Sequence, residues 1–302
     1  MKQAIGIDIG GTKIAAGIVT ESGNLLHRTE VKSDPSNREK MFAKVVEAVE
    51  LVLEKSSLSI SDIAGLGIGV PGKVDRENGV AVFQNNLPWR NFPLSKRLSD
   101  HFVIERITTD NDVYMAAFAE WRHSGTLNNE TFVYVTVSTG ISSTIIQNGS
   151  FFRGAGFAGE LGLIPVLSIR NQNENKRLEK VAAGPAIQQM AREDLKEEQL
   201  LTKDVFGGYH KGKLELKKII EEVADNIAQG LYSISCLIDP HKIVFGGSVM
   251  VNNPFLLELI KEKLQIYQIP EQHHVLEQMR ISTLKQDNGV VGAGQRVFEG
   301  MC

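Results

Sequence analysis

The chain has 302 residues, of which 42% are hydrophobic and 23% charged, and its formal net charge is −3 at pH 7. That length predicts about two domains with packed cores, and the charge gives no reason to expect a nucleic acid or an anionic membrane as partner. No apolar run approaches membrane-spanning length, and the sequence opens on a predicted strand without a secretory leader. The two cysteines, Cys236 and Cys302, are too few for a disulfide framework. We therefore expect a cytoplasmic, globular enzyme.

The first predicted element is a hairpin. An apolar run over 4–9 predicts a buried strand, and a second strand begins at Ile14. Between them Gly10 and Gly11 allow a tight turn with outward-facing N–H groups, which can hold an anion. Asp8, at the strand end, can hold a metal-bound water, so the pattern predicts a site for nucleotide phosphates and Mg²⁺. An ordinary Gly-Gly hairpin is the alternative, and neither a Walker A loop nor a GxGxxG motif is present.

The segment that follows has alternating helices and strands. Apolar residues at helical spacing predict the first helix, and short apolar runs predict the strands. The expected elements are a helix over 38–55, a strand over 64–70 ending at Pro71-Gly72, a strand over 102–109 and a helix from Asp112 to about Arg122.

Asp112 is the carboxylate that we expect to act in catalysis. It stands where a strand ends and a helix begins, the edge at which open α/β sheets bind ligands. An ionised Asp, favoured by the helix N-terminus, can take the proton of a substrate hydroxyl that attacks the γ-phosphate of ATP. Asn111 offers a donor and an acceptor to sugar hydroxyls. The alternative is that Asp110 or Asp112 is an N-cap.

The pattern of the opening hairpin recurs weakly over 132–149, which again reads as strand, small-residue turn, strand and turn. Two such hairpins predict two similar αβ domains, each presenting a phosphate-facing turn to a shared cleft, with a boundary near residue 115. A third glycine turn, Gly246-Gly247, follows a short strand over 243–245 and suits a nucleotide base or ribose, the alternative being a strand-to-helix turn that binds no ligand. A helix over 214–237 precedes it, and we expect Cys236 to lie in the core.

Seven short motifs occur in order along nearly the whole chain. They are Asp8-Ile9-Gly10-Gly11-Thr12-Lys13, 67–75 (GIGVPGKVD), Asn86-Leu87-Pro88-Trp89, Asn111-Asp112, Gly159-Glu160-Leu161-Gly162, 183–187 (AGPAI) and 244–247 (VFGG). In these motifs the chain resembles the ROK family of bacterial sugar kinases and repressors. The resemblance implies two actin-like ATPase (ribonuclease H-like) α/β domains with a cleft between them. They would comprise 1–115 with a C-terminal helix at about 290–302, and 116–289.

The resemblance also implies roles for individual residues. ATP and Mg²⁺ would be cofactors, with Asp8 holding Mg²⁺ through a water and Asp112 as general base for transfer to a sugar 6-hydroxyl. The residues implied in ATP binding are Gly10, Gly11, Thr12, Lys13, Thr139, Gly140, Gly246 and Gly247. Those implied in sugar binding are Gly72, Asn86, Asn111, Asp112, Glu160 and Glu179. A homodimer that binds a sugar, and neither nucleic acid nor membrane, is the implied assembly.

The sequence departs from the family at its structural zinc site. The positions of the family's one His and three Cys ligands hold Leu163, Arg170, Gln172 and Arg177 here. None of these is a zinc ligand, so we expect no structural zinc. Glu179 is kept and could still reach the sugar, the alternative being a solvated loop without sugar contact. We expect Arg170 or Arg177 to form an ion pair with Glu174 or Glu179.

The second phosphate turn departs as well. The family's GTGxGGG reads Ser138-Thr139-Gly140-Ile141-Ser142-Ser143-Thr144, so side chains occupy positions that are usually bare. Hydroxyls can bond phosphate oxygens, but a Cβ at Ser142 is expected to hold the phosphates farther off. Altered specificity and weakened catalysis are both compatible with this change.

Four functions therefore compete. An ATP-dependent kinase of a hexose or N-acetylhexosamine leads, followed by a catalytically weak sugar sensor or regulator of the same fold. The family's repressors carry a helix-turn-helix before the first strand, whereas this sequence begins at that strand, so we do not expect DNA binding. An actin-like assembly protein would leave the sugar-facing residues without a role, and a dinucleotide oxidoreductase lacks its glycine motif. N-acetylmannosamine, allose, glucose, fructose, mannose and glucosides remain open as substrates.

Overall fold

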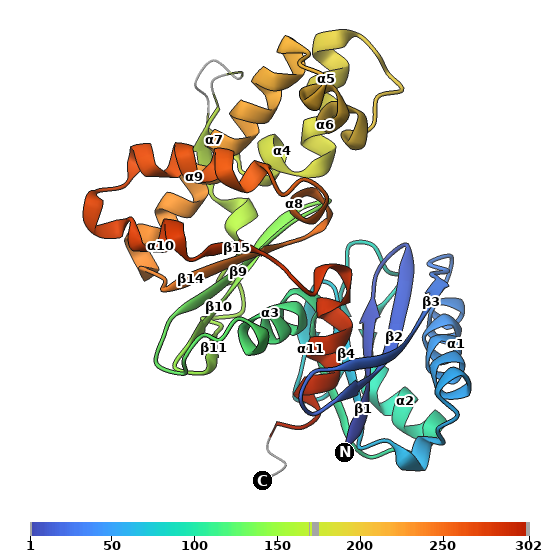
Figure 1. Cartoon of the computed structure of the whole chain (residues 1–302). Helices are drawn as coiled ribbons and strands as arrows, with labels where there is room; N and C mark the ends of the chain where they lie inside the picture. Colours follow the sequence, from blue (N-terminus) through green and yellow to red (C-terminus); the bar gives the residue numbers. More distant parts are fainter. Residues whose placement is uncertain (1, 169, 171–174, 300–302) are drawn as a thin grey trace. The chain divides into compact units, whose positions relative to one another are not determined.

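A computed structural model describes residues 2–168, 170 and 175–299 (Figure 1). The chain divides into two compact units. The first contains the described residues up to Ser124 together with those from Asp287 onward, and the second is Gly125–Gln286. The boundary that we placed near residue 115 would divide a helix of the first unit, which runs to His123.

Each unit contains a five-stranded sheet of one pattern. In the first unit the order is β3-β2-β1-β4-β8, in which β1, β2 and β3 are antiparallel and β4 and β8 extend the sheet in parallel. In the second unit the order β11-β10-β9-β14-β15 repeats this arrangement. The repeat that the two hairpins predicted is therefore confirmed. The strands are β1 Gln3–Ile9, β2 Lys13–Thr20, β3 Leu25–Lys32, β4 Leu66–Val70, β8 Ile107–Asn111, β9 Phe132–Val137, β10 Ile141–Gln147, β11 Ser150–Phe152, β14 Lys242–Gly246 and β15 Met279–Ile281.

Helices and a small sheet complete the first unit. The expected helix over 38–55 is α1, which is capped by the Asn37 carboxamide and buries one apolar face. The expected strand over 102–109 is wrong in its first half. Phe102 ends α2 and Val103 is 90% exposed in the left-handed region. The elements are α1 Arg38–Ser56, α2 Leu94–Phe102, α3 Asp112–His123, α11 Asn288–Arg296, β5 Lys73–Asp75, β6 Val80–Phe83 and β7 Arg90–Phe92.

The last helix, α11, lies directly against strands from the start of the chain (Figure 1). A Cβ at Gly67 of β4 would overlap the carbonyl of Ala293, and one at Gly292 would overlap the carbonyl of Met115 in α3. Only glycine allows these backbones to approach so closely. Close packing therefore makes α11 part of the first unit.

In the second unit, the long helix α7 is the centre of the core. Its buried positions recur every three or four residues and include Ile220, Val223, Ile227 and Leu231. It ends at Ile238 and is capped by Asp239, which is left-handed with φ 47° and precedes Pro240. Cys236 is exposed near this end, so its expected core position is wrong. The elements are β12 Pro165–Leu167, β13 Asn175–Arg177, α4 Glu179–Ala182, α5 Gly184–Leu195, α6 Thr202–His210, α7 Leu214–Ile238, α8 Ser248–Asn252, α9 Leu256–Tyr267 and α10 His274–Glu277.

Over the described part of the chain, no helix is both long and apolar enough to cross a membrane.

Candidate functional site

The turn between β1 and β2 has the tight geometry that the sequence predicts. The Gly10 N–H donates to the Lys13 carbonyl at 2.9 Å, and the Ser33 hydroxyl donates to the Gly10 carbonyl at 2.7 Å. Because the Gly10 N–H closes the turn, it is not available to a phosphate. A Cβ at Gly11 would lie 3.0 Å from the Cβ of Asn86. The turn therefore packs against the loop that carries a predicted sugar-binding residue.

Asp8 lies at the end of β1, against the start of α11. A Cβ at Gly289 would come within 2.7 Å of the Asp8 carboxyl carbon. Burial raises the pKa of Asp8 to about 6, although the charges of Lys13 and Arg28 act in the opposite direction. A bound cation would offset this cost of burying the carboxylate.

Asp8 is the carboxylate beside this turn that could hold a magnesium ion together with substrate phosphates. Among the described residues, no group of three or more His, Cys, Asp or Glu side chains could hold a metal ion. Mg²⁺ is often bound by one or two carboxylates together with substrate phosphates and waters. One partly buried carboxylate beside a glycine turn therefore suits this ion.

Lys13 is the first member of a line of ion pairs at this turn. Its Nζ lies 2.9 Å from Glu30, Glu30 lies 2.7 Å from Arg28, and the Arg28 Nε lies 2.7 Å from Asp287. Hydrogen bonds from Lys13 and Arg28 hold the pKa of Glu30 below its usual range. The line joins the turn to the residue that precedes α11, and Lys13 would have to share its charge between Glu30 and a phosphate.

At the junction of β8 and α3, Asn111 is the N-cap. Its Oδ1 accepts from the Val113 N–H at 2.9 Å, and its Nδ2 donates to the Gly72 carbonyl at 3.0 Å. Asp110 accepts from the Asn111 N–H, and Asp112 is the first helical residue. Asp112 also accepts from the Val113 N–H at 3.0 Å, so the N-cap Asn111 and Asp112 share this helix N–H. Asn111 keeps a second amide hydrogen and a second lone pair for a ligand.

The loop between β6 and β7 presents Asn86 as an exposed side chain. Trp89 anchors the loop, since its ring is fully buried, stacks on Phe92 at 4.8 Å between centroids and donates from Nε1 to the Arg38 carbonyl at 3.1 Å. Gln84, which sequence reasoning missed, is also fully buried and donates to the Lys73 carbonyl. Because glutamine side chains are mostly exposed in proteins, the sequence gave no indication that Gln84 is buried.

In the second unit, the turn at Ser138 is held by the start of α5. The Ser138 N–H donates to the Gly140 carbonyl at 2.9 Å, and the Gly184 N–H donates to the Ser138 carbonyl at 2.8 Å. A Cβ at Gly140 would lie 3.7 Å from an oxygen of Glu179. The turn containing Thr139 and a predicted sugar-binding carboxylate are thus neighbours.

The serines that replace glycines after this turn have structural partners. The Ser143 hydroxyl donates to the Gly159 carbonyl at 2.7 Å, and Ser142 hydrogen-bonds the Glu160 carboxylate. Desolvation and the negative charge of Glu179 raise the pKa of Glu160, whereas the Ser142 hydroxyl lowers it. The departure from the glycine pattern therefore supplies a hydrogen bond to a predicted sugar-binding residue.

Gly246 and Gly247 form the turn between β14 and α8. Gly247 has φ +82°, and a Cβ there would overlap the Val137 carbonyl at the end of β9. A side chain at this position would be both strained and obstructed. The turn therefore lies beside the end of the strand that leads into Ser138.

Comparison with known proteins gives the family. The family described as "ROK family" matches residues 4–297. The chain belongs to the ROK family. A glucokinase of Halalkalibacterium halodurans is 28% identical, covering 96% of this chain and 93% of its own. An N-acetylmannosamine kinase of Yersinia pseudotuberculosis is 29% identical over 97% of each chain. The crystal structure of a ROK glucokinase from Streptomyces griseus with glucose and AMPPNP has a TM-score of 0.81 and 25% identity, covering 99% of this chain and 100% of that one.

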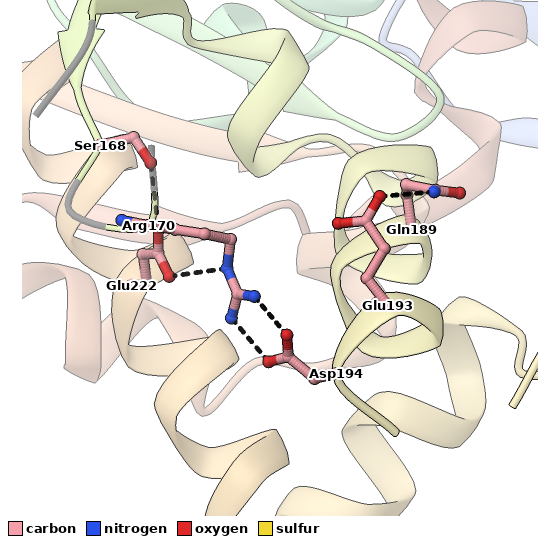
Figure 2. A network of polar contacts seen from close by, with 6 residues as sticks. All are labelled: Ser168, Arg170, Gln189, Glu193, Asp194 and Glu222. Atoms are coloured by element: carbon pink, nitrogen blue, oxygen red, sulfur yellow. Dashed lines mark hydrogen bonds and ion pairs between the residues drawn. The ribbon is translucent and has the colours of Figure 1, made fainter. Parts of the chain in front are cut away.

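In this ROK protein Arg170 forms ion pairs with two residues that the sequence did not predict. Figure 2 shows Arg170 bound to Asp194 of α5 and Glu222 of α7. Glu174, an expected partner, and Gln172 lie outside the described residues. Leu163 is 43% exposed and Arg177 is also exposed. Sequence reasoning missed Asp194 and Glu222, because neither lies in a family motif.

Proposed function

We propose that the protein is an ATP-dependent sugar kinase that phosphorylates a hexose or N-acetylhexosamine at its 6-hydroxyl. The observation that carries the proposal is the junction of β8 and α3. Asn111 takes the capping role there, and Asp112 stands at the first helical position beside it. The relatives named as glucokinase and N-acetylmannosamine kinase support the class of reaction.

Asp112 is the general base in this proposal. Its carboxylate accepts the proton of the sugar hydroxyl while that oxygen bonds to the γ-phosphorus of ATP, and the bond from phosphorus to the β,γ-bridging oxygen breaks to release ADP. Asn86, Asn111 and the Gly72 backbone would orient the sugar. Gly72 is fixed for this task, since it has φ +83° and its carbonyl accepts from Asn111.

The nucleotide would use both glycine turns and the turn after β14. In the first unit, the N–H groups of Gly11 and Thr12 with the Lys13 ammonium would hold phosphate oxygens, and Asp8 would hold the water shell of Mg²⁺. When bound, Mg²⁺ neutralises the charge of the phosphates. In the second unit, Thr139 and Gly140 would hold phosphates and Gly246-Gly247 would border the adenosine.

Glu160 and Glu179 are the proposed sugar-binding carboxylates of the second unit. Desolvation and the negative charge of Glu179 raise the pKa of Glu160. Hydroxyl groups of a sugar would stabilise both carboxylates by donating hydrogen bonds to them. The pair therefore suits a polyhydroxylated substrate.

An assay of ADP release with ATP and Mg²⁺ tests the proposal on N-acetylmannosamine, allose, glucose, fructose, mannose and a β-glucoside. Turnover that depends on one of these sugars is the expected result, and mass spectrometry of the product would give the phosphorylated position. If a sugar raises Tm but no sugar is phosphorylated, the kinase proposal is wrong and the protein is a sugar sensor.

A further inference from the structure

Arg170 is bound through its whole guanidinium group, after β12 and before β13. Nη1 lies 2.5 Å from Oδ1 of Asp194, and Nη2 lies 2.8 Å from Oδ2 of the same carboxylate. This is the bidentate arrangement in which two parallel hydrogen bonds fix both side chains, as Figure 2 shows. β12 and β13 pair antiparallel as a hairpin, and Asp194 belongs to the last turn of α5, so Arg170 ties this hairpin to that helix.

Glu222 of α7 completes the cluster. One carboxylate oxygen accepts from Arg170 Nε at 3.3 Å, and the other accepts from the Arg170 backbone N–H at 3.3 Å and from the Ser168 hydroxyl at 3.0 Å. The side chains of Arg170, Asp194 and Glu222 are 25%, 30% and 14% exposed. This partial shielding distinguishes the cluster from the fully exposed ion pairs that contribute little.

A second anchor lies further along the same helix. The Gln229 carboxamide accepts from the Leu167 N–H at 2.9 Å and donates to the Leu167 carbonyl at 3.0 Å. Glu222 and Gln229 are two turns apart and share one face of α7. The β12 side of the hairpin is therefore fixed to α7 at two points, one of which is Arg170.

The pair of Arg170 and Asp194 also closes a loop of chain that contains predicted site residues. Between them along the sequence lie β13, then Glu179 at the start of α4, then Gly184 at the start of α5. Glu179 lies beside Gly140, and the Gly184 N–H binds the Ser138 carbonyl. The loop thus approaches the turn Ser138–Gly140 through Glu179 and Gly184. The pair of Arg170 and Asp194 joins the two ends of this loop.

We propose that Arg170 is a positioning residue, which holds the hairpin to α5 and α7 and thereby fixes Glu179 relative to the turn Ser138–Gly140. The inference rests on the proposed function in so far as Glu179 binds the sugar. Arg170 itself touches no reacting atom in this proposal. It affects sugar binding only through the position of the hairpin and of Glu179.

Three variants of the full chain test this role. Arg170→Met removes the cluster, Arg170→Lys keeps a charge without the planar fork, and Asp194→Asn removes the bidentate partner. Arg177→Met is the matched control, because it removes the same charge from β13, where the side chain is exposed. Should Arg170→Met fail to fold, Arg170→Lys and Asp194→Asn still test the role.

The kinetic result expected is a rise in KM for the sugar. For Arg170→Met, kcat/KM for the sugar should fall about 10- to 100-fold, since a displacement of about 1 Å at a site can cost that much. KM for ATP should change less than about twofold, and adding Asp194→Asn to Arg170→Met should cost little more. A merely destabilising change would lower the active fraction and leave KM for the sugar unaltered. The control Arg177→Met should also leave KM for the sugar unaltered. A KM for the sugar equal to that of Arg177→Met would overturn the proposal.

Amide hydrogen exchange over residues 175–183 provides a readout that needs no activity. Exchange should be faster in Arg170→Met than in the wild type and in Arg177→Met, with the sheet of the first unit unchanged. Equal exchange in the two variants would overturn the role of Arg170 whatever the enzyme does. Absence of sugar-dependent turnover in the wild type would instead refute the proposed function, and the exchange comparison would still decide the inference.

Discussion

Asp8→Asn should make the ligand-free protein more stable at neutral pH, although it removes a residue of the proposed magnesium site. The carboxylate is held against Gly289 with a pKa of about 6 instead of 3.8. The cause is desolvation, which disfavours the charged form. That difference corresponds to about 3 kcal/mol of unfolding free energy lost once Asp8 is ionised. Asparagine has nearly the same shape without the charge, so the loss is relieved.

The pH dependence of the effect has a definite sign. Below about pH 4 the wild-type carboxyl is protonated in both the folded and the unfolded chain, so it contributes nothing. Between about pH 4 and pH 6 the folded chain keeps the proton that the unfolded chain loses, and stability falls as pH rises. Above about pH 6 the full cost is present. The stability gained by Asp8→Asn should therefore grow across this window and then level off.

Urea unfolding of the full chain, without nucleotide or divalent cation, measures this at about pH 4.5, 6 and 7.5. Asp75→Asn is the matched control in the same unit. A hydrogen bond with Asn78 lowers the pKa of Asp75, so its replacement should destabilise slightly. A loss of stability in Asp8→Asn at neutral pH, or a difference from the wild type that does not change with pH, would refute the reasoning. Mg²⁺ with ATP should then stabilise the wild type more than the variant.

Three other substitutions test the site. Asp112→Asn should lower kcat by about three orders of magnitude or more while a sugar still raises Tm, measured by ADP release and thermal unfolding; turnover close to wild type would place the base elsewhere. Trp89→Ala should destabilise the protein by about 3–5 kcal/mol, because it empties a fully buried site and removes the bond to Arg38; urea unfolding unchanged from wild type would contradict this. Ser142→Gly removes a hydrogen bond that lowers the pKa of Glu160, so the acidic limb of the pH–rate profile should move to higher pH, and an unmoved limb would show that Glu160 does not control activity.

Local chemistry made much of the fold predictable. Gly-Gly turns between apolar runs marked both hairpins, and the spacing of apolar residues gave α1 and α7 nearly to their ends. The failures also have local causes. The apolar residues Phe102 and Val103 suggested a strand, but they end a helix with an exposed left-handed residue. Cys236 lies on the exposed face of α7 although its neighbours Ile234 and Ser235 are buried, and the apolar residues around it gave no indication of this.

The site was less predictable because its side chains compete for the same backbone groups. Asp110, Asn111 and Asp112 are all good capping residues, and only the folded geometry shows that Asn111 takes the role. The partners of Arg170 are 24 and 52 residues away along the chain, so no local pattern points to them. Predictions that rested on turn chemistry could be made from sequence, whereas those that rested on long-range pairing could not.

The packing of α11 against β1 and β4 has a consequence for biosynthesis. The second unit is one uninterrupted stretch, Gly125–Gln286, and every residue of it leaves the ribosome before α11 does. The first unit begins earlier but keeps its glycine-lined face open until residues 288–296 arrive. The usual order of co-translational folding, N-terminal domain first, is thereby reversed for its final step. A chain truncated after Gln286 and released from the ribosome should contain the whole second unit and a first unit still lacking its last helix.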